Sequence, residues 1–183
     1  MQLVPDGMLS AVRGTNFISS ITASAASTVN FTGLSTTYNE YVIKMWGVIP
    51  GTDAVSLLSR VSTDGGSTYH SASTDYQYGY TWVGSTGSTG VIYNNAGDSV
   101  VIASAGVSNV AARTLSGEFH VYQPWQTVNY TQCIFSVIYR NATPQIVTVQ
   151  GGGTYQGNNV NAIQFLMSSG TISGTFALYG ILN

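Results

Sequence analysis

The chain has 183 residues, of which 7 % are charged, with five Lys and Arg against seven Asp and Glu and a net charge of −2. This length suits one domain with a sizeable core, and the charged fraction lies far below the roughly 25 % of ordinary soluble domains. The basic residues are scattered along the sequence, which argues against nucleic-acid binding, because that function needs clustered Lys and Arg. They are Arg13, Lys44, Arg60, Arg113 and Arg140.

The sequence contains no apolar run of about 18 or more residues, so we expect no membrane span. Its first residues lack the basic and apolar regions of a secretory signal. The single Cys133 rules out an internal disulfide, and its strand-like context predicts a small buried side chain. Because charge repulsion is weak, Ser, Thr, Asn and Gly must keep the surface wet, which suits a subunit of a larger assembly.

Residues 1–22 form a first segment in which the pattern predicts no clear element. Residues 7–14 are compatible with a short helix or with an extended arm. Two interpretations stay open, namely a frayed terminus and an arm that docks on another subunit. We therefore divide the chain into an N-terminal arm, residues 1–22, and a folded domain, residues 23–183.

From residue 23 onward, alternating apolar and polar residues predict about ten short strands separated by turn signals. Asp64-Gly65-Gly66 is typical of a hairpin turn that requires positive φ. The strand at 130–140 is apolar on both faces, which is typical of a central strand. The expected strands lie within residues 27–34, 38–48, 54–63, 75–82, 91–93, 99–103, 114–122, 130–140 and 145–150.

The final stretch, residues 160–182, is expected to form two strands around the loop 168–174. Ile163, Phe165 and Met167 share one face of the first strand, and Phe176 and Leu178 share one face of the second. A chain that ends in so apolar a strand must place it inside a sheet, because a bare edge would pair with other chains. The whole pattern predicts an all-β fold, an antiparallel two-sheet β-sandwich of jelly-roll type.

An aromatic residue recurs at every second position of the segment 75–82. In a strand, Tyr76, Tyr78, Tyr80 and Trp82 therefore form one aromatic face. This face either turns toward the core or another subunit, or forms a platform on which sugar rings stack. We favour the core-facing or oligomer-facing row.

Few residues could carry chemistry. Glu118 and His120 lie two apart on one strand and could touch, but an exposed polar strand face explains them better than an acid–base pair does. Asp64 and Asp75 could approach each other as glycosidase carboxylates do. Loop carboxylates could also hold calcium, but their pattern is not specific for a calcium site. No zinc-ligand spacing is present. We therefore expect no metal, no cofactor, no catalytic residue and no enzymatic activity.

Several segments resemble bacteriophage virion proteins in their order along the chain. They are Phe31-Thr32-Gly33-Leu34, the segment Tyr38 to Val48, the segment Arg60 to Tyr69, and Asp75-Tyr76-Gln77-Tyr78. The ending Ser168-Ser169-Gly170-Thr171-Ile172-Ser173-Gly174-Thr175-Phe176-Ala177-Leu178-Tyr179-Gly180-Ile181 is similar to the C-terminal β-sandwich of phage fibre and capsid-surface proteins. The resemblance covers about residues 25–183 and consists of scaffold motifs, so it transfers no active-site residue.

This resemblance implies a structural virion protein on the capsid or tail surface, made in the host cytoplasm and assembled as a homo-oligomer, in particular a homotrimer. Because the sequence has no fibrous repeat, a capsid-decoration protein, head fibre or short tail appendage fits better than a long tail fibre. Residues 1–22 would then contact other virion proteins. The alternative is a tail-fibre tip that binds a host-surface glycan, with Trp125 and Tyr155 as candidate contacts.

Overall fold

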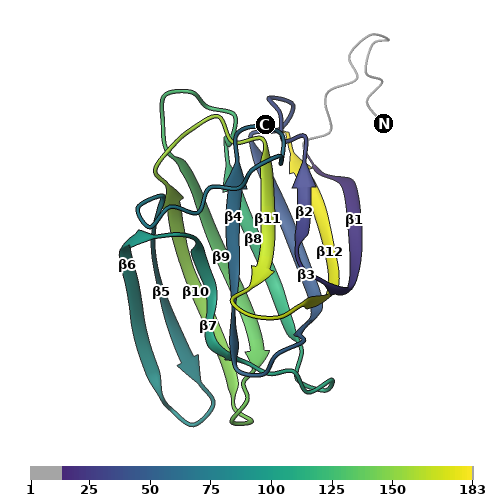
Figure 1. The fold of residues 1–183 in the computed structure, drawn as a ribbon, viewed down its shortest axis with the longest axis vertical. Helices are drawn as coiled ribbons and strands as arrows, with labels where there is room; N and C mark the ends of the chain where they lie inside the picture. The colour runs from purple at the N-terminus through teal and green to yellow at the C-terminus, as the bar shows by residue number, and fades with distance from the viewer. Residues whose placement is uncertain (1–13, 183) are drawn as a thin grey trace, which may run out of the picture.

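The computed structural model describes residues 14–182, and all regular structure in that range is β-strand. The strands form two antiparallel sheets packed face to face, with the four-stranded sheet in front of the eight-stranded one in Figure 1. The predicted two-sheet β-sandwich is confirmed, whereas its jelly-roll connectivity stays a prediction. No helix in the described range has the length and apolarity needed to cross a membrane.

The two sheets differ in width. The larger sheet has the order β1-β12-β3-β8-β9-β10-β5-β6. Its strands are β1 (Thr15–Ala26), β12 (Ile172–Ile181), β3 (Glu40–Pro50), β8 (Leu115–Tyr122), β9 (Thr131–Arg140), β10 (Ile146–Tyr155), β5 (Tyr76–Gly84) and β6 (Thr89–Gly97). The smaller sheet has the order β2-β11-β4-β7 and consists of β2 (Val29–Thr32), β11 (Ala162–Met167), β4 (Val55–Ser62) and β7 (Val100–Val107).

The strand pairs are nested around the β5–β6 hairpin. Moving outward along the chain, β4 pairs with β7, β3 with β8, β2 with β11 and β1 with β12, all antiparallel. Successive pairs fall in alternate sheets. The hairpin of β9 and β10 is inserted between β8 and β5.

The central strand β9 shows how the core is divided from the surface. Phe135 and Val137 are buried between the sheets, whereas Ile134 and Ile138 point outward and are each 48 % exposed. The sequence correctly placed β9 in the middle of a sheet. Its second apolar face is nevertheless open, because the smaller sheet covers only one side of the larger one.

The two C-terminal strands form as predicted, but they do not pair with each other. β11 lies in the small sheet between β2 and β4, and β12 lies in the large sheet between β1 and β3. The intervening loop crosses from one sheet to the other. Phe165 and Phe176 point inward from opposite sheets, so the end of the chain closes the core rather than forming a hairpin.

The predicted boundary at residue 22 is wrong for the described part of the arm. Thr15–Ala26 forms β1, which pairs with β12 along most of its length and supplies one edge of the large sheet. The sandwich therefore includes Thr15–Ala26, because these residues gain ladder hydrogen bonds from β12. The remainder of the predicted arm, residues 1–13, lies outside the described residues.

Candidate functional site

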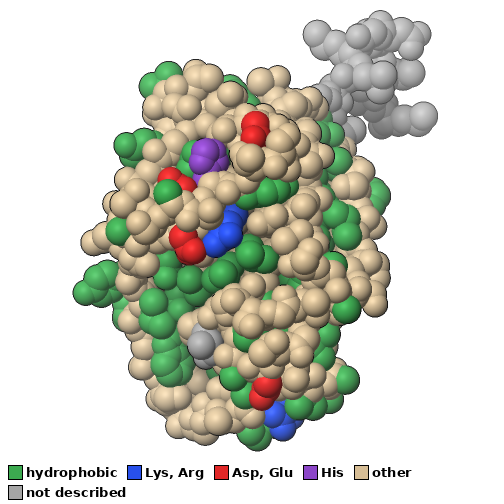
Figure 2. Space-filling view, in the orientation of Figure 1, with side chains coloured by type: hydrophobic (Ala, Val, Ile, Leu, Met, Phe, Trp, Pro, Cys, Tyr) green, Lys and Arg blue, Asp and Glu red, His purple; other side chains and the backbone are tan. Residues whose placement is uncertain are grey.

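The outer face of the large sheet lies on the side away from the viewer in Figures 1 and 2. It is hollowed into a trough across β8, β9, β10 and β5. It consists of three adjoining hollows, the largest about 560 Å³ in volume. The largest hollow lies over Ile138 and Thr148, and a second lies over Gly79 and Gly152. A third, beside His120, joins them: it shares Glu118, Ser136 and Gln150 with the largest hollow and Ile134 with the second. We call this feature the outer trough.

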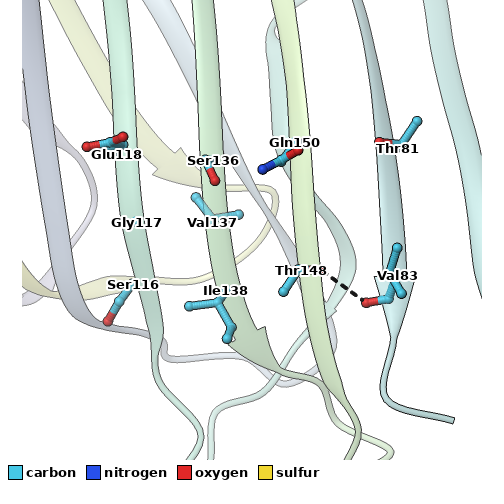
Figure 3. Close-up of a pocket in the computed structure, with 10 residues that line it drawn as sticks. All are labelled: Thr81, Val83, Ser116, Gly117, Glu118, Ser136, Val137, Ile138, Thr148 and Gln150. Carbon is cyan, nitrogen blue, oxygen red and sulfur yellow. Dashed lines mark hydrogen bonds between the residues drawn. The ribbon is translucent and has the colours of Figure 1, made fainter. Parts of the chain in front are cut away.

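Cross-strand register gives the outer trough a polar row. Glu118 pairs with Ser136, Ser136 with Gln150, and Gln150 with Thr81, so four polar side chains lie side by side on four neighbouring strands. Figure 3 shows this row with a second, more apolar row beside it. The second row consists of Ser116, Ile138, Thr148 and Val83.

The other end of the outer trough has a floor without side chains. Gly152 of β10 and Gly79 of β5 are register partners, with Ile134 and Tyr93 as the next partners on either side. The hollow here has a volume of about 420 Å³. Its rim carries amides, hydroxyls and one aromatic ring, contributed by Gln77, Asn95, Tyr122, Gln132 and Thr154.

His120 lies between two carboxylates at the β8 side of the outer trough. Its Nδ1 is 2.6 Å from Glu40 Oε1, and its Nε2 is 3.4 Å from Glu118 Oε1. The expected contact between Glu118 and His120 is present, and Glu40 of β3 adds a third member that the sequence did not indicate. Because both ring nitrogens face acidic groups, neither is directed at a hydroxyl or thiol nucleophile.

The aromatic row of β5 turns toward the space between the sheets. Tyr76 and Tyr80 are buried in the core, while Tyr78 and Trp82 are partly buried and pack against it. Two of these rings are thus unavailable for stacking a sugar. The row serves packing, and only its Tyr78 and Trp82 side chains retain some exposure.

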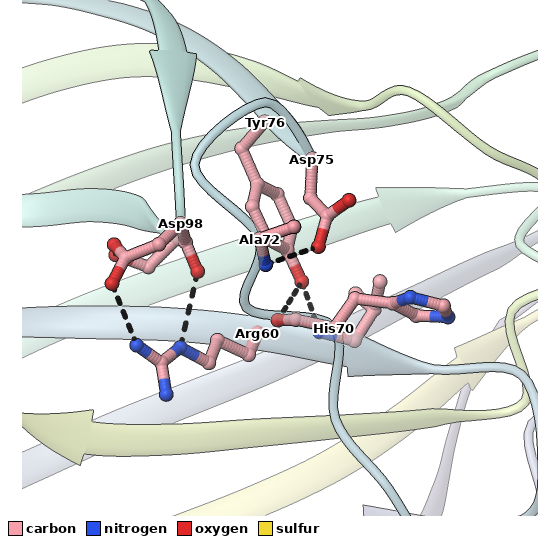
Figure 4. A network of polar contacts seen from close by, with 8 residues as sticks. Arg60, His70, Ala72, Asp75, Tyr76 and Asp98 are labelled. Carbon is pink, nitrogen blue, oxygen red and sulfur yellow. Dashed lines mark hydrogen bonds and ion pairs between the residues drawn. The ribbon is translucent and has the colours of Figure 1, made fainter.

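The hydroxyl of Tyr76 ties β5 to β4 and to the loop between them. It accepts a hydrogen bond from the Val61 amide at 2.9 Å and donates one to the His70 carbonyl at 3.1 Å (Figure 4). Burial raises the pKa of Tyr76 well above its ordinary value. Beside it, Arg60 pairs with Asp98 at 2.9 Å on the surface of the small sheet. This network is structural.

Both residues predicted to bind a glycan are engaged in packing. Trp125 is partly buried, and its Nε1 donates to the Tyr38 carbonyl at 3.1 Å. Tyr155 is also partly buried, with its ring 4.7 Å from His70 and 5.5 Å from Tyr76 between centroids. Neither side chain lines the outer trough.

The loop carboxylates are also occupied locally. Asp64 accepts hydrogen bonds from Ser62 and from Thr68, which lower the pKa of its carboxyl group. Asp75 accepts one from the Ala72 amide at 2.6 Å (Figure 4), so each acid caps its own turn. In the described range, no three His, Cys, Asp or Glu side chains gather as metal ligands would.

Sequence reasoning missed the outer trough, although β5 carried a signal for it. Between the aromatic positions lie Gln77, Gly79, Thr81 and Val83, which face the opposite way and are mostly small or polar. The aromatic residues at the even-numbered positions are the stronger pattern, and they indicate only the inward face of β5. Which face of the strand would be covered could not be read from the alternation alone.

No protein-family model matches the chain, and the comparison with curated proteins gives no match. The resemblance to phage virion proteins therefore stays a prediction from the residues.

Proposed function

We propose that this chain is a non-enzymatic structural subunit of a bacteriophage virion, a capsid-decoration, head-fibre or short tail-appendage protein. It is made in the host cytoplasm and assembles with copies of itself, as a trimer, on the particle surface. The observation that carries the self-assembly is the apolar, uncharged edge strand β6, and the virion setting follows from the resemblance of residues 25–183.

Strand β6 ends the large sheet with a free row of backbone hydrogen-bonding groups. Within Thr89–Gly97 there is no charged residue and no proline. Val91 and Tyr93 are 73 % and 76 % exposed on its outer face. Edge strands of monomeric proteins are usually blunted by Lys, Pro or bulges. The ladder of β6 has an irregularity only near its end, between Asn94 and Gly97. Its regular stretch Thr89–Asn94 therefore remains an apolar edge that favours burial against another chain.

The inner face of this edge extends past the small sheet. Trp82 and Ile92 are only partly buried there, in contrast to the fully covered Tyr80. On the face seen in Figure 2, hydrophobic side chains gather over the region of β5, β6 and β7. A charge-poor apolar surface of this kind has the composition of an interface core, and a second copy would cover it.

The nested strand pairs support a jelly-roll connectivity, in which one antiparallel ribbon wraps into two sheets. The pairs β5–β6, β4–β7, β3–β8 and β2–β11 would form its eight strands, with β9–β10 as an insertion and β1–β12 as an extension. The occupied nitrogens of His120 support the absence of catalysis. Fold alone would not give this function.

Sedimentation or light scattering of the purified full chain tests the assembly. We expect a mass of three chains for the wild type and one chain for Val91→Lys, because a lysine blunts an exposed edge. Val128→Lys is the matched control, since Val128 is 82 % exposed but lies in a loop. A monomeric wild type, or a Val91→Lys variant that still assembles, would contradict the role of β6.

The virion setting has a separate test. Antibodies against the purified chain should label intact particles of the encoding phage, and purified particles should contain the chain. Deleting residues 1–13 leaves β1 intact and asks whether that segment anchors the protein. We expect the truncated chain to fold and assemble but to be lost from particles. Full incorporation would show that residues 1–13 do not anchor the protein.

A further inference from the structure

One of the two glycines at the floor of the outer trough, Gly79, is not explained by the packing of the sheet. A β-carbon added at Gly79 would meet no atom closer than 3.6 Å, which is ordinary contact, and Gly79 does not have positive φ. Glycine in a strand interior weakens the strand and often marks a place where a ligand or another backbone approaches closely. The fold itself would accept a larger residue at position 79.

The neighbouring glycine on β10 provides a contrast. A β-carbon at Gly151, which faces the core, would lie 2.3 Å from Tyr80 Cβ, so the packed sandwich requires glycine there. At Gly152 the nearest atom would be the Cys133 carbonyl oxygen at 2.8 Å. The sheet therefore disfavours any side chain at Gly152, because the clash is with backbone, whereas it leaves Gly79 unconstrained. The bare backbone at Gly79 is the feature that packing does not explain.

The lining of this hollow specifies the chemistry of the ligand. Amides on its rim can each donate and accept hydrogen bonds, and Gln77 Nε2 is held by the Asn95 carbonyl at 3.3 Å. The ring of Tyr122, itself stacked 6.5 Å from His120, supplies an apolar surface at the β8 side. No Lys, Arg, Asp or Glu lines the hollow.

A ligand that fits must be uncharged, rich in hydroxyl groups and flat enough to lie on exposed backbone. We propose that the hollow over Gly79 and Gly152 binds a neutral saccharide, with its ring on the glycine floor and its hydroxyls on the Gln77 and Gln132 amides. The polar row of Ser136, Gln150 and Thr81 continues the site (Figure 3). The trough crosses three inter-strand spacings, about 14 Å, which favours an oligosaccharide over a single ring.

This inference goes beyond the structural role and places glycan recognition on different residues from Trp125 and Tyr155. An anionic polysaccharide fits less well, because the ionisable groups beside the trough are His120 with the two carboxylates Glu40 and Glu118, and no arginine or lysine lines it. Binding to a neutral saccharide should also be insensitive to added salt, since no charge pair would be screened.

The test uses the purified full chain on an array of neutral oligosaccharides of glucose, galactose, mannose, rhamnose and N-acetylglucosamine, together with acidic ones of galacturonate and sialate. We expect binding to at least one neutral oligosaccharide. Gly79→Val should fill the hollow and weaken that binding roughly tenfold or more, while the β-branched side chain suits a strand and keeps the unfolding temperature unchanged or higher. Ser20→Val, exposed on the far edge strand β1, is the control and should bind as the wild type does.

Three results would overturn the proposal: no neutral oligosaccharide bound, acidic ones bound alone, or binding that survives Gly79→Val. Sedimentation of the Gly79→Val variant measures its oligomeric state, so a loss of saccharide binding can be distinguished from a loss of self-assembly. If Gly79→Val has the wild-type mass but no longer binds, the saccharide site stands whatever the oligomer is. If the wild type assembles but binds nothing, only the saccharide site fails.

Discussion

Phe165 of β11 and Phe176 of β12 face each other across the sandwich, with their ring centroids 5.6 Å apart and both side chains fully buried. Phe165 also meets Phe119 of β8 edge to face at 5.5 Å. The three rings join both sheets at the centre of the core. The last two strands therefore stabilise the fold through inter-sheet packing as well as through their ladders.

Removing one of these rings should be severe. We expect Phe165→Ala to lower the free energy of unfolding by about 3–5 kcal/mol, because it loses apolar burial and leaves a cavity between the sheets. Phe17→Ala is the matched control, since Phe17 is mostly exposed on β1 and meets Tyr179 edge to face, so its loss should stay within about 1.5 kcal/mol. Chemical denaturation of both variants measures the difference. Equal effects would mean that the rings do not join the sheets as described.

Alternation predicted which residues share a face, because side chains in a strand point to opposite sides in turn. It placed Val29 with Phe31 and Phe176 with Leu178 correctly, and all four are core residues. It could not predict which strands pair. The separation of β11 and β12 into different sheets depends on long-range ladders that a local pattern does not encode.

The candidate site was harder to predict for a related reason. A large sheet covered by a smaller one leaves apolar and polar side chains outside, and the difference in width is invisible in the sequence. Ile134 and Ile138 therefore read as core but lie on the surface. Trp125 shows the reverse error: it was predicted to contact a glycan at the surface, but it is partly buried. Its N–H donates to the carbonyl of Tyr38, which lies 87 positions away in the sequence.

Tyr76 should be sensitive to the loss of a single oxygen. Tyr76→Phe keeps the ring but leaves the Val61 amide and the His70 carbonyl without this partner. We expect a loss of about 1–3 kcal/mol in the free energy of unfolding, since unsatisfied buried groups are costly. Tyr93→Phe, on an exposed ring, should change nothing measurable. Denaturation midpoints compare the two variants, and an unchanged midpoint for Tyr76→Phe would show that water replaces the hydroxyl.

Alkaline pH should destabilise the fold through Tyr139 and Cys133. Burial raises the pKa of Tyr139 from 10.0 to about 12 and the pKa of Cys133 from 9.0 to about 12. Between the unfolded and folded pKa values the unfolded chain has lost the proton and the native chain retains it, so stability falls as pH rises. The contribution is intact below the unfolded pKa, and each group removes up to about 1.4 kcal/mol per pH unit within its window.

The measurement is the free energy of unfolding as a function of pH. We expect the decline to begin near pH 9 with Cys133 and to steepen above pH 10 with Tyr139 and Tyr76, whose pKa burial also raises. Tyr139→Phe should remove part of the steeper decline, because burial also raises the pKa of Tyr76 and leaves its contribution in place. Tyr130→Phe, on an exposed loop side chain, should leave the curve unchanged. A wild-type curve that stays level from pH 9 to about 11 would show that these groups are not held neutral by burial.

Two glycines of the same sheet, on neighbouring strands, should respond in opposite ways to the same substitution. Gly151→Ala would place a methyl group 2.3 Å from Tyr80 Cβ and 2.6 Å from the Gly79 carbonyl oxygen, so the β5–β10 ladder must shift. We expect it to lose about 1–3 kcal/mol of unfolding free energy, the usual cost of overpacking. Gly79→Ala meets nothing closer than 3.6 Å and should be neutral or slightly stabilising, because alanine loses less backbone entropy on folding.

Thermal unfolding of the two variants gives the comparison. If both lose stability equally, the sheet requires glycine at position 79 after all, and the bare floor of the outer trough would have a structural cause instead of a ligand.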